Sequence, residues 1–391
     1  MEKRKLRGGM VGGGIGSFFG PVHRMAAELD GQAEYVCGAF SADPQKSKQS
    51  GAALYMDPAR VYKNYQEMAV KEAALPADKR IDFVTIVTPN YTHFDAACTF
   101  LEADFHVICD KPMTCNLAEA KELKTIVDKT GKVFALTHTY TGYPMVKQAR
   151  HFVQQGLLGE INKVVVEYPQ GWLANFLEDG VTPATMWRTD PKKAGVSLCM
   201  GDIGIHAENL GRYVTGLEIE KLCADLSRYI PGNQLDDDGN ILVNYKGGAK
   251  GIIYASQIST GEENGLNIRV YGTKLGLNWN QEKPGYLTLK NKDGITTTYS
   301  KGNRSLCQEA QNAARLPPGH PEGIIEALAN IYLGAFKAIQ AGEGNKFVPG
   351  YDYPTVNDGV TGMAFVETVL ASAAFDRKWV NMFSTGIKES R

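Results

Sequence analysis

The first 140 residues alternate short apolar or β-branched runs with longer amphipathic stretches. This pattern is typical of parallel strands joined by crossover helices, because parallel strands cannot be connected by a tight turn. It predicts strands near 6–11, 34–40, 82–88, 106–110 and 133–138, and helices around 21–30, 44–51, 64–74, 92–103 and 117–130. The first part of the chain is therefore predicted to be an α/β domain with a parallel sheet.

The pattern changes after about residue 141. A helix over 144–155 is followed by longer strand-like runs, at 161–169, 241–245, 249–258, 266–271 and 286–289. The turn sequences Lys246-Gly247-Gly248 and Asp293-Gly294 favour antiparallel hairpins. Since 391 residues exceed the usual size of one domain, we predict two, over 1–141 and 142–391. The second is expected to be an α/β domain with an open, mostly antiparallel sheet, and the helices predicted at 321–341 and 356–376 could pack on either domain.

Charge and cysteine content exclude several classes of partner. Lys plus Arg is 42 and Asp plus Glu is 43, so a net charge of −1 offers no basic field for nucleic acid or an anionic membrane. No signal peptide or long apolar span is readable. Seven scattered cysteines without a C-x-x-C pair fit reduced thiols, so we predict a cytoplasmic protein without a metal site.

A glycine-rich turn follows the first predicted strand, at 11–20. In such a turn, backbone N–H groups and a helix N-terminus can face a pyrophosphate, which makes Gly12, Gly14, Ile15 and Gly16 candidate dinucleotide contacts. The spacing departs from the Gly-x-Gly-x-x-Gly pattern. Counted from Gly12, the third glycine position is occupied by Ser17. Counted from Gly14, the third glycine is Gly20, which comes one residue too late. An ordinary strand-to-helix turn is the alternative interpretation.

The second predicted strand ends at Phe40 and is followed by Ser41 in place of an acid. A carboxylate at this position would bind the ribose 2′-hydroxyl and repel a 2′-phosphate. Ser41 and Lys46 could instead bind that phosphate, so we hypothesise that NADP is accepted as well as NAD. The alternative is that Ser41 caps the next helix and Lys46 is solvated.

Two further strand ends carry polar residues at the edge where open α/β sheets bind ligands. One is Thr88-Pro89-Asn90, in which Thr88 and Asn90 are candidate neighbours of the nicotinamide ribose, with His93 more consistent with capping or packing than with catalysis. The other is Asp110-Lys111-Pro112, where proline restricts the backbone beside the lysine. Lys111 could also be an ordinary exposed lysine.

Asp202 and His206 occur in Gly201-Asp202-Ile203-Gly204-Ile205-His206, before an amphipathic run. On a helix, residues four apart project from one face, so this pair could hold one substrate, with His206 as general base and Asp202 as hydroxyl acceptor. Equally open is that Asp202 is only an N-cap and His206 a core histidine.

Taken together, these motifs resemble the Gfo/Idh/MocA family of sugar and cyclitol oxidoreductases. The resemblance covers nearly the whole chain and includes Leu158-Gly159-Glu160-Ile161, with Asp110 standing where the family has glutamate. It implies an N-terminal Rossmann domain that binds NAD or NADP and a C-terminal α/β domain. The implied cofactor contacts are the candidates named above together with Pro89, His93, Asp110 and Lys111. It also implies a catalytic set of Lys111, Asp202 and His206, with Lys111 stabilising charge on the reacting oxygen.

Other stretches resemble a subgroup of the family that acts on glucosides and related sugars. They contribute the candidate substrate contacts Tyr140, Trp187, Arg188 and His320, each of which could equally be structural. Trp172 and Trp279 are expected to be structural. The resemblance implies hydride transfer to a secondary hydroxyl of a sugar, glycoside or cyclitol, with C3 of a glucoside favoured. Glycoside cleavage through transient oxidation by tightly bound NAD, or non-catalytic dinucleotide sensing, are the alternatives. A homo-oligomer, dimer or tetramer, is also expected.

Overall fold

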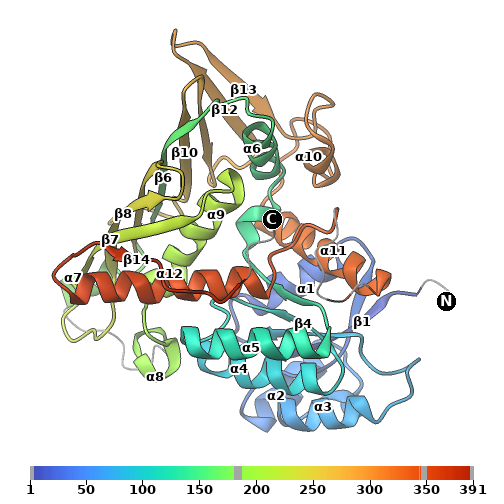
Figure 1. Cartoon of the computed structure of the whole chain (residues 1–391). Helices are drawn as coiled ribbons and strands as arrows, with labels where there is room; N and C mark the ends of the chain where they lie inside the picture. Colours follow the sequence, from blue (N-terminus) through green and yellow to red (C-terminus); the bar gives the residue numbers. More distant parts are fainter. Residues whose placement is uncertain (1–3, 180–186, 343, 345–349, 388–391) are drawn as a thin grey trace. The chain divides into compact units, whose positions relative to one another are not determined.

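The computed structural model describes residues 4–179, 187–342, 344 and 350–387, and the chain divides into two compact units (Figure 1). Unit 1 comprises Met1–Thr114, Ala118–Thr139 and Leu328–Gly359. Unit 2 comprises Cys115–Leu117, Tyr140–Ala327 and Val360–Arg391. Each unit is built around its own β-sheet.

Unit 1 contains a five-stranded parallel sheet in the order β2-β1-β3-β4-β5. Its strands are β1 (Leu6–Gly12), β2 (Ala33–Ala39), β3 (Phe83–Val87), β4 (His106–Cys109) and β5 (Phe134–Leu136). The parallel sheet and all five predicted strands are confirmed. The strand order reverses between β1 and β3, and the carboxyl ends of the strands at such a switch point are where open α/β sheets bind ligands.

The five helices predicted for this part of the chain are also present. They are α1 (Gly20–Glu28), α2 (Pro44–Ala53), α3 (Tyr65–Ala73), α4 (His93–Glu102) and α5 (Leu117–Thr130). Local sequence explains where they begin: Pro21 lies in the first turn of α1, and the Asn64 side chain caps α3 by accepting a hydrogen bond from the amide of Glu67.

A segment from late in the chain completes unit 1. On α11 (Ile324–Ala341), Tyr332 and Phe336 are buried, and the Phe336 ring lies 5.0 Å from that of Phe83 on β3. Further along, the amide of Leu136 at β5 donates to the carbonyl of Pro354 over 2.8 Å. The core of unit 1 therefore depends on residues that come more than 180 positions after β5, its last strand. The sequence pattern had left open on which domain these late helices pack.

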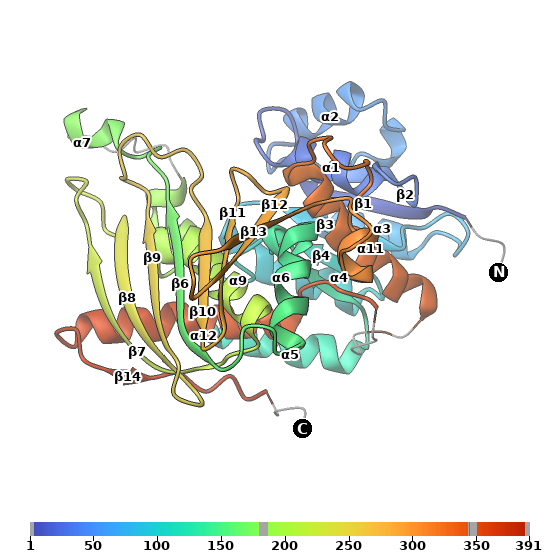
Figure 2. The same cartoon turned by 90° about the horizontal axis from the view of Figure 1, so that it is seen from above.

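Unit 2 contains a nine-stranded sheet in the order β13-β12-β11-β10-β6-β9-β8-β7-β14 (Figure 2). The strands are β6 (Ile161–Pro169), β7 (Ile219–Ser227), β8 (Asp238–Tyr245), β9 (Lys250–Ser256), β10 (Asn267–Gly272), β11 (Leu275–Asn280), β12 (Tyr286–Asn291), β13 (Thr296–Ser300) and β14 (Val380–Asn381). Only the β6–β9 pair is parallel, so the mostly antiparallel sheet is confirmed. Both predicted hairpins, β8–β9 and β12–β13, are present.

Three strands of this sheet were not predicted, namely β7, β11 and β14, and β13 was expected only as the second strand of the Asp293-Gly294 hairpin. They carry weak local signals, because β11 is rich in glycine and asparagine, β13 is an edge strand of mostly exposed threonines, and β14 has two residues. Their pairing with neighbouring strands, and not their own propensity, makes them strands.

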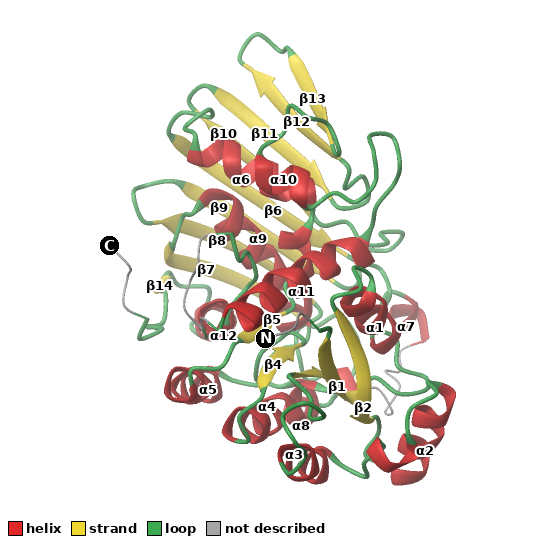
Figure 3. Cartoon of the chain, turned by 90° about the vertical axis from the view of Figure 1, so that its right-hand side faces the viewer, coloured by secondary structure: helices red, strands yellow, loops and turns green. Residues whose placement is uncertain are grey.

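Helices of unit 2 pack on one face of its sheet (Figure 3). They include α6 (Pro144–Gln154) and α9 (Ile205–Thr215), beneath which β6 buries Val164, Val166 and Tyr168. The remaining helices are α7 (Asn175–Asp179), α8 (Pro191–Ala194), α10 (Gln308–Asn312) and α12 (Val356–Ala374). Among the described residues, no helix combines the length and apolarity that a membrane span requires.

Candidate functional site

The glycine turn after β1 requires glycine for steric reasons. Gly12, Gly13 and Gly16 have φ angles of 78°, 68° and 83°, a region that other residues rarely adopt. A Cβ on Gly12 would lie 2.4 Å from the carbonyl oxygen of Val87 at the end of β3. The turn is therefore pressed against the neighbouring strand end at the switch point.

Gly20 performs the close packing that the third glycine of a dinucleotide turn normally provides. A Cβ there would lie 2.4 Å from the carbonyl oxygen of Gly13, so α1 could not approach the turn as it does. Ser17 makes the longer spacing workable, because its Oγ accepts a hydrogen bond from the amide of Gly20 over 3.1 Å. The extra residue thus lengthens the turn without opening it.

The rest of the turn packs against β2 and α2. A Cβ on Gly14 would lie 2.8 Å from the carbonyl oxygen of Phe40, and the amide of Ile15 donates to Ser50 Oγ over 3.0 Å. The amide of Ile15 is thus already used within the protein, while its side chain is 69% exposed and available to a ligand.

Asp43, and not Ser41, caps the helix that follows β2. The Asp43 carboxylate accepts from the amides of Gln45 and Lys46, and the Ser41 hydroxyl accepts from the amide of Asp43. The Lys46 residue is exposed one turn into α2. An acidic residue, Asp43, therefore lies in this turn, two residues after Ser41, which occupies the position expected for a ribose-binding acid.

His93 ties two strand ends together. One ring nitrogen lies 2.7 Å from the carbonyl oxygen of Pro112 and the other 2.9 Å from that of Thr88, while burial lowers the pKa of the imidazole. The Thr88 hydroxyl is also engaged, since it accepts from that of Thr92 over 2.6 Å. The short turn Asn90–Thr92 that connects Pro89 to α4 completes this edge. His93 is thus held between two backbone carbonyl groups.

Asp110 organises the other strand end. Its Oδ1 accepts from the amide of Lys111 over 2.8 Å and from the Thr137 hydroxyl over 3.0 Å, and its Oδ2 lies 3.8 Å from Nε2 of His23. Burial alone would raise the pKa of this carboxyl, but the neighbouring His23, Lys111 and His93 together hold it well below the usual range. The peptide bond between Lys111 and Pro112 is cis.

A buried polar chain that the sequence did not reveal continues from His23. Its Nδ1 lies 2.8 Å from the Tyr332 hydroxyl, which lies 3.3 Å from that of Tyr35 and 3.2 Å from that of Thr85. The only local signal is a histidine on the apolar side of α1, and its partner Tyr332 comes 309 residues later. This chain connects the core of unit 1 to the backbone that carries Lys111.

In unit 2, Asp202 lies within one turn of π-helix (Met200–Gly204), and His206 lies in the first turn of α9. Such π-turns are frequent at functional sites. The helix start is instead held by Asp236, which accepts from the amides of Leu198 and Met200 and from the Ser197 hydroxyl. Asp202 is therefore not the N-cap, and its Oδ2 accepts from Nε2 of Gln257 over 2.7 Å.

His206 is 6% exposed and is packed by aromatic rings that carry hydroxyl groups. The ring of Tyr140 lies perpendicular to it at 4.8 Å and that of Tyr168 lies at 6.3 Å. The two tyrosine hydroxyls are hydrogen-bonded to each other, and Tyr168 donates to Oδ1 of Asn264 over 2.7 Å. The structure thus places Tyr140, Asp202 and His206 in one region of unit 2, together with Asn264, which was not predicted.

The remaining predicted substrate contacts are Trp187, Arg188 and His320. The Arg188 guanidinium stacks on the Trp187 ring at 4.6 Å, and His320 is exposed with Nδ1 3.3 Å from the carbonyl oxygen of Pro318. Trp279 is fully buried with its Nε1 donating to Pro284, and Trp172 is partly buried against a small apolar cluster, so both are structural as expected.

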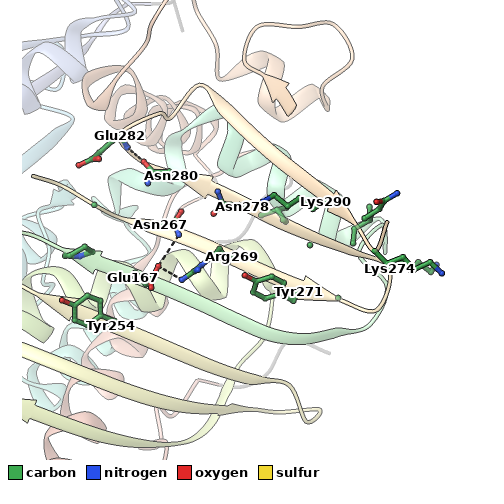
Figure 4. Close-up of a pocket in the computed structure, with 18 of the residues that line it drawn as sticks. Glu167, Tyr254, Asn267, Arg269, Tyr271, Lys274, Asn278, Asn280, Glu282 and Lys290 are labelled. Atoms are coloured by element: carbon green, nitrogen blue, oxygen red, sulfur yellow. Dashed lines mark hydrogen bonds and ion pairs between the residues drawn. The ribbon is translucent and has the colours of Figure 1, made fainter. Parts of the chain in front are cut away.

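A separate groove crosses the helix-free face of the nine-stranded sheet (Figure 4). Alternate residues of β6, β10 and β11 line it, among them Glu167, Asn267, Arg269 and Asn278, and Arg269 pairs with Glu167 at 2.6 Å. Neither histidine nor cysteine is among its lining residues. Its ionisable side chains are carboxylates, lysines, tyrosines and Arg269, and it offers no imidazole like that of His206.

Comparisons with known proteins agree with these features. Residues 6–138 match a family model described as an oxidoreductase family with an NAD-binding Rossmann fold, and residues 146–278 match the GFO/IDH/MocA C-terminal domain. An uncharacterized oxidoreductase of Bacillus subtilis, YfiI, is 34% identical and covers 96% of this chain and 97% of its own.

Solved structures of other proteins are similar over nearly the whole length of the chain. An oxidoreductase from Sinorhizobium meliloti is 43% identical, with a TM-score of 0.87 and coverage of 96% of this chain and 99% of its own. An inositol dehydrogenase homolog from Azotobacter vinelandii, complexed with NADH and myo-inositol, is 32% identical, with a TM-score of 0.89 and coverage of 97% and 98%. With its Rossmann unit, its open antiparallel sheet and these matches, the chain belongs to the Gfo/Idh/MocA family of oxidoreductases.

Proposed function

We propose that the protein transfers a hydride between a nicotinamide dinucleotide and a secondary hydroxyl of a sugar, glycoside or cyclitol. The observation that carries this proposal is the constellation in unit 2, where a buried imidazole lies among hydroxyl and amide groups beside a carboxylate held by Gln257. Such a set suits a polyhydroxylated ligand, because each of its hydroxyls needs a hydrogen-bond partner.

The glycine turn supports dinucleotide binding. Gly12 and Gly20 leave no room for a Cβ, and three glycines of the turn have positive φ, as expected where a backbone is shaped to approach a pyrophosphate. When bound, the nicotinamide ring accepts or donates the hydride. Thr88, Pro89 and Asn90 at the end of β3 are the proposed neighbours of its ribose.

In the oxidation direction, His206 would take the proton of the substrate hydroxyl, for which an imidazole has a suitable pKa. Asp202 would accept a hydrogen bond from a substrate hydroxyl, with its orientation set by Gln257. The Lys111 ammonium would stabilise the negative charge that builds on the reacting oxygen. His93 and Asp110 support the backbone on both sides of Lys111 and act as positioning residues in this scheme.

For the substrate, we propose C3 of a glucoside as the first candidate and an inositol as the second. The family resemblance favours the former, and the relative that was solved with myo-inositol supports the latter. Tyr140 and the stacked pair Trp187 and Arg188 are proposed to contact the sugar, as is His320.

For the cofactor, we propose that both NAD and NADP are accepted, with NAD preferred. Lys46 supports binding of a 2′-phosphate, while the carboxylate of Asp43 in the same turn disfavours it through charge repulsion.

We further propose a homo-oligomer. The helix-free face of the nine-stranded sheet carries exposed apolar side chains, including Leu242 and Tyr271, 49% and 43% exposed. Covering them in a symmetric assembly would remove this surface from water. Light scattering of Leu242→Arg beside the wild type tests this, and an unchanged mass would contradict it.

The decisive experiment is a substrate panel with purified protein. Methyl and nitrophenyl glucosides, free sugars and inositols are incubated with NAD or NADP while reduced nicotinamide and released nitrophenol are both measured. Net reduction of the nucleotide supports a dehydrogenase. Nitrophenol release without net reduction would favour the glycoside-cleaving alternative, and binding of the nucleotide with neither reaction would favour a sensor.

A further inference from the structure

Three side chains with metal-binding atoms meet outside the site described above. They are His151 in the last turn of α6, Cys307 immediately before α10, and Glu309 in the first turn of α10. One ligand atom from each, an imidazole nitrogen, the thiol sulfur and a carboxylate oxygen, lie within 4.8 Å of one another. No other group of three such side chains is found in the described part of the chain.

The two elements that carry these residues are held together by other contacts. Helices α6 and α10 pack against each other, and the backbone amide of Cys307 donates to Oε1 of Gln148, one turn before His151, over 2.7 Å. Leu306 and Ala310 on either side of Cys307 are buried. The three side chains are thus brought together by packing that does not depend on them, which lowers the entropic cost of binding an ion.

We propose that His151, Cys307 and Glu309 form a binding site for Zn²⁺, with water as the fourth ligand. Thiolate, imidazole and carboxylate are the donor types that zinc takes in tetrahedral sites, at about 2.0–2.3 Å from the ion. One thiolate and one carboxylate balance the charge of the divalent cation. His151 and Cys307 are partly exposed and Glu309 is exposed, so water and the ion can reach the site.

In the binding step the S–H bond breaks and a Zn–S bond forms, with release of one proton to solvent and no change of oxidation state. The ion would join the end of α6 to the start of α10, and it would stabilise the folded protein by an amount that grows with the logarithm of the Zn²⁺ concentration once this exceeds the dissociation constant. The sequence offered no sign of this site, because His151 and Cys307 are far apart in the chain.

The test uses the full-length protein, stripped of metal with a chelator and titrated with Co²⁺ as a spectroscopic probe and then with Zn²⁺. The wild type should show a thiolate-to-cobalt charge-transfer band at one equivalent, which Zn²⁺ abolishes, and about one proton should be released per Zn²⁺ at a pH below the thiol pKa. The melting temperature should rise with Zn²⁺ concentration.

Variants locate the ligands. Cys307→Ser should lose the charge-transfer band. His151→Gln and Glu309→Gln keep the thiol, and each should weaken Zn²⁺ binding at least about tenfold, because loss of a residue that only supports a metal ligand already lowers metal affinity by that factor. Cys223→Ser is the matched control, because its thiol lies on β7 and donates to the carbonyl of Arg377. Absence of the band in the wild type, or its persistence in Cys307→Ser, would overturn the site. Should Cys307→Ser fail to fold, unchanged affinity in both glutamine variants would overturn it equally.

Discussion

Gln257 donates a hydrogen bond from its Nε2 to Oδ2 of Asp202 over 2.7 Å, at the carboxyl end of β9 and from a fully buried position. Its Oε1 is also buried and makes no hydrogen bond within the described residues. The Gln257 side chain therefore holds the Asp202 carboxylate in one orientation. In the proposed reaction, Gln257 is a positioning residue.

Gln257→Met should lower kcat/KM by about 10- to 100-fold, because it keeps the packing volume but frees the carboxylate. Gln257→Glu should instead move the acidic limb of the pH-rate profile to higher pH, since a second carboxylate disfavours ionisation of Asp202. Gln32→Met at an exposed position is the control. Wild-type rates and an unmoved profile in both variants would remove this role.

His206→Ala should lower turnover by about 10²- to 10⁴-fold if the imidazole is the general base. Binding of NAD, measured by quenching of protein fluorescence, should change little, because the glycine turn lies in unit 1. An unchanged rate would reject the general-base role.

Asp43→Asn should raise the ratio of kcat/KM for NADP over NAD by about fivefold, since asparagine retains the helix cap and removes the repelling charge. Lys46→Ala should lower the same ratio by a similar factor. Steady-state kinetics with NAD and with NADP measure this ratio in each variant. Equal NADP efficiency in Lys46→Ala and the wild type would show that this lysine does not contact the 2′-phosphate.

Gly20→Ala should destabilise the protein by about 1–3 kcal/mol and weaken NAD binding, because the new Cβ would meet the backbone of Gly13 at 2.4 Å. Gly285→Ala is a matched control, since its nearest neighbour would be Cγ of Lys301 at 3.5 Å, an ordinary van der Waals distance. Urea unfolding and NAD titration measure the two effects. Equal losses in both variants would contradict the packing argument.

Asp110→Asn should cost about 1.5–3 kcal/mol of stability at pH 7, the range for hydrogen bonds to a charged group. Because the folded-state pKa of Asp110 is depressed, this stabilisation is present above the ordinary carboxyl pKa of about 3.9 and is lost as the pH falls through the lower folded value. The difference from wild type in urea unfolding should therefore be constant between pH 5 and 7 and shrink below about pH 4. A difference that grows towards acid would refute it.

Local sequence predicted the elements whose signal is periodic and strong. All five strands and five helices of the Rossmann unit were expected, as were the hairpins at Gly247 and Gly294. The strands of unit 2 that lack such a signal, such as β11 with Gly276 and Asn278, were not, because cross-strand pairing outweighs their low propensity.

Residue roles divide in the same way. Sequence alone proposed the glycine turn, Asp202 and His206 as site residues, and it left open which glycine packs the helix and whether Asp202 is a cap. The structure answers both points, with Gly20 against Gly13 and with Asp236 at the helix start.

The amino-acid sequence by itself determined the order of strands and helices, because this order depends on neighbours within a few residues, and it indicated the family through short motifs along the chain. Only the tertiary structure decided that Gln257 holds Asp202, that Tyr332 reaches His23, and that Cys307 meets His151. Such contacts join residues tens to hundreds of positions apart, and they form when buried polar groups must find partners in a packed core, a condition that no local pattern records.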